Sequence, residues 1–121
     1  MKEREIDFIA LCYSKDKWVR GSFVEKEGGS YIEVKKKGRE LIRRNTLCQF
    51  TGFVSSLNQR IYEGCIIRFH NRLVQDWEVV WKDGCFMLKS RTTVPEYRTF
   101  SEWKDVIKGN SVEVIGHILD D

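Results

Sequence analysis

The run of basic residues Lys35–Arg44 (KKKGRELIRR) holds the side chains with the most distinctive potential chemistry. Its formal charge is +5, whereas the whole chain carries +3, so the positive charge is local and the remaining sequence is slightly acidic. Clustered lysines and arginines can neutralise phosphates and release counterions, which is the electrostatic basis of nucleic-acid binding. The same residues also suit a solvated turn and edge strand, where lysines discourage pairing between molecules. The candidate contact residues in this run are Lys35, Lys36, Lys37, Arg39, Arg43 and Arg44.

Trp18 and Arg20 form a second candidate contact, because they share one face of a predicted strand. An exposed tryptophan beside an arginine can stack a base or anchor a protein partner, although packing in the core is the alternative role. The other tryptophans, Trp77, Trp81 and Trp103, lie on apolar stripes and are predicted core residues.

Patterns that would indicate catalysis or cofactor binding are missing from the sequence. His70 and His117 are the only histidines, and no serine or cysteine forms a nucleophile motif with either. We predict His117 to lie at the surface or rim, on a terminal strand. There is no glycine-rich phosphate loop, and the four cysteines lack the close pairs typical of zinc sites. We therefore predict a non-enzymatic protein with no cofactor, metal site or small-molecule substrate, whose thiols are free and mostly buried.

Length and composition predict a single globular domain spanning residues 1–121. Hydrophobic residues make up 41% of the chain and charged residues 32%, which is typical of soluble folded proteins. No apolar run approaches the roughly 20 residues that a membrane helix needs. The N-terminal sequence MKEREIDF is charged where a signal peptide would be apolar, so we expect the reducing cytoplasm.

Alternating apolar and polar residues predict a mainly β fold that begins with a three-stranded antiparallel meander. Its strands are expected at residues 5–11, 17–24 and 31–34. Asp83-Gly84 predicts a later hairpin between residues 77–82 and 85–89, and the polar segment Ser90–Arg98 is predicted to be a loop. Thr99 with Glu102 forms a capping box, which predicts one short helix over residues 100–108. The strand count favours a small closed or partly open antiparallel barrel.

A motif in the middle of the chain, QFTGF followed by IYEG, carries a family resemblance. Its residues are Gln49, Phe50, Thr51, Gly52, Tyr62, Glu63 and Gly64. Together with EVVW at residues 78–81 and EVIG at 113–116, it resembles the YopX family of small phage and prophage proteins. The sequence departs from the family pattern at Cys65, where relatives usually carry an acid after the Glu-Gly pair. From the residues themselves, the motif either builds the architecture or lines a groove for a peptide or a single nucleic-acid strand.

The resemblance implies an SH3-like β-barrel or roll, a phage or prophage origin, and the bacterial host cytoplasm. It implies no known reaction. The expected function is therefore that of an accessory protein, a YopX-like module that binds a protein partner or assembles with itself and has no membrane contact. The alternative function is nucleic-acid binding through residues 35–44.

Overall fold

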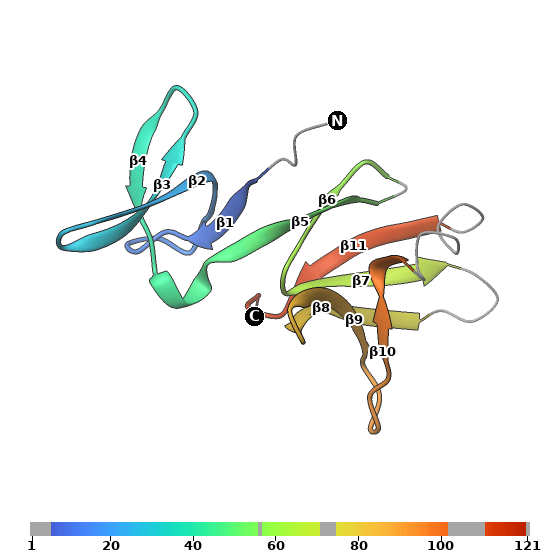
Figure 1. Cartoon of the computed structure of the whole chain (residues 1–121). Coiled ribbons are helices and arrows are strands. Elements are labelled where there is room, and N and C mark those ends of the chain that lie inside the picture. The colour runs from blue at the N-terminus through green and yellow to red at the C-terminus, as the bar shows by residue number, and fades with distance from the viewer. Residues whose placement is uncertain (1–5, 56, 71–74, 102–110, 121) are drawn as a thin grey trace. The chain divides into compact units, whose positions relative to one another are not determined.

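The computed structural model describes residues 6–55, 57–70, 75–101 and 111–120. Its strands belong to two compact units, which meet in the sequence between Gly52 and Phe53 (Figure 1). We refer to them as the N-terminal unit and the C-terminal unit. Both are built from antiparallel strands, so the predicted mainly β antiparallel class is confirmed.

The N-terminal unit begins with the predicted meander, which is confirmed. Successive strands pair antiparallel, and the hydrogen-bonded order is β4-β3-β2-β1-β5. Strand β5 continues past Gly52 into the C-terminal unit, where β6 is its neighbour. The strands are β1 (Phe8–Leu11), β2 (Trp18–Lys26), β3 (Gly29–Val34), β4 (Gly38–Leu41), β5 (Cys48–Val54) and β6 (Arg60–Tyr62).

The N-terminal sheet rolls up around a small core of Ala10, Ile32 and Ile42, which are almost fully buried. A bridge between Cys12 and Ile42 joins the ends of β1 and β4. Here the backbone N–H of Arg43 donates to the carbonyl of Leu11 at 3.0 Å. The chain then turns through a single 3₁₀ turn, η1 (Arg44–Thr46), before β5. These contacts make the unit a small roll.

The C-terminal unit contains a five-stranded sheet with the order β10-β9-β8-β7-β11. The predicted hairpin is confirmed, and both of its turn residues, Asp83 and Gly84, have positive φ, as a two-residue hairpin turn of type I′ requires. The strands are β7 (Cys65–His70), β8 (Gln75–Lys82), β9 (Cys85–Ser90), β10 (Tyr97–Thr99) and β11 (Ser111–His117).

Two predictions about this unit were wrong. Trp77 is buried as expected, but Trp81 is 56% exposed and packs edge-on against Phe86. Strand β7 pairs with β8 only as far as Glu78, so the hairpin end that carries Trp81 extends past that neighbour. In addition, the predicted loop at 90–98 ends in strand β10, which begins at Tyr97 and gains its hydrogen bonds from β9.

The predicted helix falls mainly outside the described residues. Phe100 and Ser101 are helical, and the structure does not describe residues 102–108. Both sheet orders are open, so the closed SH3-like barrel stays a prediction. Within the described residues no helix has the length and hydrophobicity needed to cross a membrane.

Candidate functional site

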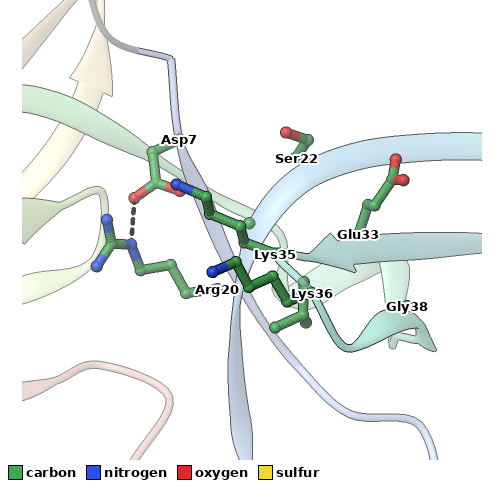
Figure 2. A pocket seen from close by; sticks show the side chains of 9 residues that line it. Asp7, Arg20, Ser22, Glu33, Lys35, Lys36 and Gly38 are labelled. Atoms are coloured by element: carbon green, nitrogen blue, oxygen red, sulfur yellow. Dashed lines mark hydrogen bonds and ion pairs between the residues drawn. The ribbon is translucent and has the colours of Figure 1, made fainter.

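A groove of about 660 Å³ lies on the N-terminal unit, where β2, β3 and the turn after β3 come together (Figure 2). We call it the basic groove, because it contains three of the sequence-predicted contact residues, Arg20, Lys35 and Lys36. Its walls also carry two acids. Among the described residues, its lining consists of Asp7, Arg20, Gly21, Ser22, Glu33, Val34, Lys35, Lys36 and Gly38.

Gly21 allows β2 and β3 to approach closely at the base of the groove. A β-carbon on residue 21 would stand 2.1 Å from the carbonyl oxygen of Glu33, far inside van der Waals contact. At the same point β2 changes neighbours, since Gly21 pairs with Phe8 of β1 and Ser22 pairs with Glu33 of β3. A side chain at position 21 would therefore force the two strands apart.

Arg20 is held at one edge of its guanidinium group. Its Nε–H donates to the carboxylate of Asp7 at 2.7 Å, and the Asp7 side chain is only 9% exposed. Among the described residues, no group bonds the two terminal Nη nitrogens, and the Arg20 side chain remains 54% exposed. The buried acid therefore orients the guanidinium group and leaves its Nη edge available for a carboxylate or phosphate.

Lys35 and Lys36 form the turn between β3 and β4, closed by a 3.0 Å hydrogen bond from the Lys37 N–H to the Val34 carbonyl. Their side chains extend in the same general direction, toward the side where Asp7 and Arg20 lie (Figure 2). Neither ammonium group has a hydrogen-bond or ion-pair partner in the part of the chain that the structure describes. The groove thus presents two unneutralised lysines beside an oriented arginine.

The other sequence-predicted basic residues do not join this cluster. Arg43 pairs with Asp16 at 3.0 Å, and the guanidinium of Arg44 lies over the ring of Phe23 at 5.0 Å. Lys37 and Arg39 are exposed but do not line the groove, and the half-buried Trp18 does not line it either. Of the six basic residues in the run Lys35–Arg44, only Lys35 and Lys36 therefore line the groove.

The family-like motif is built into the architecture. Phe50, Thr51 and Tyr62 are buried, while Gln49 and Glu63 are half-buried. Gly52 and Gly64 have φ values of 90° and 85°, which side chains rarely adopt. These observations favour the structural interpretation of the motif over a groove that it lines.

The imidazole ring of His117 leaves no room for a side chain at Gly64. The predicted surface or rim position of His117 was wrong. The residue is buried, its Nε2 donates to the Glu63 carbonyl at 2.9 Å, and its Nδ1 accepts the Leu119 N–H at 3.1 Å. The neutral Nε2–H tautomer satisfies both bonds. Alternation along β11 could not reveal this burial, because the register shifts between Val114 and Gly116.

The unusual residue of the motif, Cys65, is buried and closes the turn that contains the Glu-Gly pair. Its Sγ accepts the backbone N–H of Tyr62 at 3.3 Å. Burial raises the pKa of the thiol, the bond from Tyr62 lowers it, and the charge of Asp120 raises it further. The side chain at this position therefore supports the turn from inside the unit and does not face solvent.

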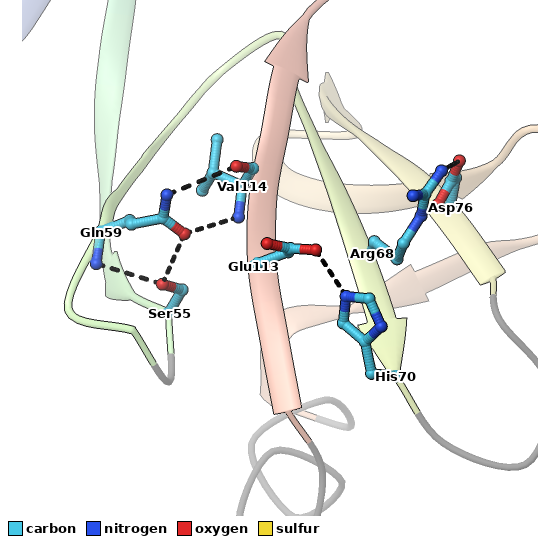
Figure 3. A network of polar contacts seen from close by, with 7 residues as sticks. All are labelled: Ser55, Gln59, Arg68, His70, Asp76, Glu113 and Val114. Carbon is cyan, nitrogen blue, oxygen red and sulfur yellow. Dashed lines mark hydrogen bonds and ion pairs between the residues drawn. The ribbon is translucent and has the colours of Figure 1, made fainter.

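Gln59 fixes the loop between β5 and β6 to strand β11 (Figure 3). Its Oε1 accepts the Val114 N–H at 2.8 Å, and its Nε2 donates to the Val114 carbonyl at 3.4 Å. The hydroxyl of Ser55 accepts the Gln59 N–H at 3.1 Å, which orders the loop itself. The side-chain amide of Gln59 therefore hydrogen-bonds both the N–H and the carbonyl of Val114, which point away from β7.

Charged side chains line one face of β7 and its neighbours (Figure 3). Arg68 holds Asp76 through two bonds, of 2.7 and 3.0 Å, and His70 lies 2.6 Å from Glu113. The hydrogen bond from Arg68 lowers the pKa of Asp76. All four side chains are at least 30% exposed. We interpret them as paired surface charges, with no base and nucleophile in contact.

Comparison with known proteins gives one family assignment. The family model described as YopX protein matches residues 2–121, which is essentially the whole chain. A search of curated proteins finds no match. Among the described residues, no group of three or more histidine, cysteine or acidic side chains could hold a metal ion.

Proposed function

Because this chain belongs to the YopX protein family, we propose that it is a non-enzymatic phage or prophage accessory protein that binds another protein. The proposed interface is the basic groove of the N-terminal unit. The proposed location is the cytoplasm of the bacterial host, where a partner protein would be available.

The mixed charge of the groove carries this proposal. Arg20, Lys35 and Lys36 stand beside Asp7 and Glu33, so the described residues of the lining have one net positive charge. Protein surfaces recognise one another through such complementary mixtures of charge, which give specificity and orientation. A second copy of this chain is one possible partner, since the surface carries both signs of charge.

Nucleic-acid binding is the second candidate function, because the ammonium groups of Lys35 and Lys36 are unpaired among the described residues. Nucleic-acid interfaces are far more uniformly positive than this groove. The carboxylates of Asp7 and Glu33 would repel phosphates, and Arg43 and Arg44 are engaged elsewhere. The groove therefore suits a protein segment better than a polyanion.

Site-specific photocrosslinking in the producing bacterium tests the proposal. A photoreactive amino acid would replace Ser22, which is exposed and lines the groove. The matched control would replace Glu27, which is exposed in the turn after β2 and lies outside the groove. We expect a discrete nuclease-resistant adduct from position 22 only, with twice the mass of the chain if the partner is a second copy. A nuclease-sensitive adduct, or the same products from both positions, would overturn the protein-binding function.

A further inference from the structure

The basic groove has features that specify the chemical group it binds. We propose that it recognises a carboxylate on an acidic segment of the partner protein, with Arg20 and Lys36 as the principal contacts. This inference rests on the proposed protein-binding function and adds the chemistry of the ligand.

The first supporting feature is the orientation of Arg20. The buried Asp7 engages Nε at 2.7 Å, which fixes the guanidinium plane before any ligand arrives. The free Nη edge then offers two parallel donors, which match the two oxygens of a carboxylate.

The second feature is the backbone of Lys36, which has a φ of 66°. Among the described residues, three non-glycine residues have positive φ, and the other two are Asn58 and Asp83. Asparagine and aspartate adopt this conformation more readily than lysine, which adopts it at a cost in conformational energy. Glycine or asparagine is the usual residue at the third position of such a turn. A lysine in a strained backbone position, with its side chain in a groove, indicates a role in binding that outweighs the cost in stability.

The third feature distinguishes a carboxylate ligand from a nucleic-acid phosphate backbone. Glu33 stands in the groove with Ser22 and has no side-chain partner in the described part of the chain. A peptide can place an acidic residue against the cations and direct an amide or basic group at Glu33. A continuous phosphate backbone carries only negative charge and cannot satisfy Glu33.

Fluorescence anisotropy with the full chain tests this assignment. The probe is a labelled glycine-serine peptide with one central glutamate at low salt, with the same peptide carrying glutamine instead and single-stranded oligodeoxythymidine of similar length as comparisons. We expect the glutamate peptide to bind more tightly than either comparison. Arg20→Lys keeps the charge but removes the fork, and Lys36→Gly removes a cation without adding backbone strain. Each should weaken binding about fivefold.

Lys37→Gly is the matched control, because Lys37 belongs to the same turn and carries the same charge but does not line the groove. It should weaken binding less than about twofold. Equal losses from Lys36→Gly and Lys37→Gly, or no loss from Arg20→Lys, would mean general charge attraction and overturn the inference. Tighter binding of oligodeoxythymidine would do the same. If position 22 crosslinks to a protein but the glutamate peptide does not bind, the carboxylate assignment fails while the protein-binding function stands.

Discussion

Gly64 and the imidazole ring of His117 lie so close together that a β-carbon on residue 64 would stand 2.5 Å from ring atoms Cε1 and Nε2. The glycine of the Glu-Gly pair thus has two requirements, a positive φ and the absence of a side chain. Gly52 shares only the first, since a β-carbon there would meet nothing within 4 Å. The two glycines therefore form a natural pair for separating backbone strain from contact.

Gly64→Ala should destabilise the protein more than Gly52→Ala. The conformational strain costs about 1–2 kcal/mol in each variant, and the collision with His117 adds about 1–3 kcal/mol in Gly64→Ala only. Urea denaturation of both variants measures the difference. Equal losses would show that the imidazole ring moves aside without cost.

Lys36→Gly should stabilise the fold by about 0.5–1 kcal/mol, because glycine adopts positive φ without strain and this gain exceeds its entropic cost. Lys37→Gly should have the opposite effect, a loss of about 0.5–1 kcal/mol, since Lys37 does not have positive φ. Thermal denaturation of both variants gives the comparison. A destabilised Lys36→Gly protein would show that the lysine side chain supports the turn.

Asp76→Asn should lower the midpoint of thermal unfolding by a few degrees at most at neutral pH, because both side chains of its pair with Arg68 are partly exposed to solvent. The folded pKa of Asp76 is lower than the usual value of 3.8. Its contribution is therefore fully present above that value and disappears as the pH falls through the folded pKa. Melting curves of wild type and variant should converge only below about pH 4. Convergence already at pH 6 would contradict the lowered pKa of Asp76.

Thiol labelling should divide the four cysteines into one fast and three slow. Cys85 is exposed, whereas Cys12, Cys48 and Cys65 are buried. Burial also raises the pKa of the Cys65 thiol, which keeps the reactive thiolate scarce. Under native conditions a maleimide should modify Cys85 first, and mass spectrometry after digestion identifies the site. Rapid labelling of Cys65 in the folded protein would contradict its position in the structure.

Local sequence patterns predicted much of the fold. Asp83-Gly84 specified a hairpin, and alternation specified the meander, because both signals depend only on neighbouring residues. The position of Trp81 depends on where the neighbouring strand β7 stops pairing, which its own stripe does not encode. Strand β10 is three residues long and exists through its bonds to β9, so no periodicity could reveal it.

The site was predicted only in part, for a similar reason. The sequence located the basic residues but could not show which of them act together. Arg43 and Asp16 are 27 positions apart, and only the rolled sheet brings them into contact. Asp7, which immediately precedes β1, likewise reaches Arg20 of β2 only because the two strands pair. The sequence also conceals the positive φ of Lys36, which no composition or spacing reports.

The amide of Gln59 has a consequence for how these molecules behave in a crowded solution. Strand β11 ends the sheet, and the outward backbone groups of Val114 would be a template for a strand from another molecule. Gln59 already pairs with both groups, so a side chain occupies the place that an incoming strand would need. The loop thereby blocks intermolecular strand pairing at Val114. The ordering of the Gln59 side chain costs conformational entropy.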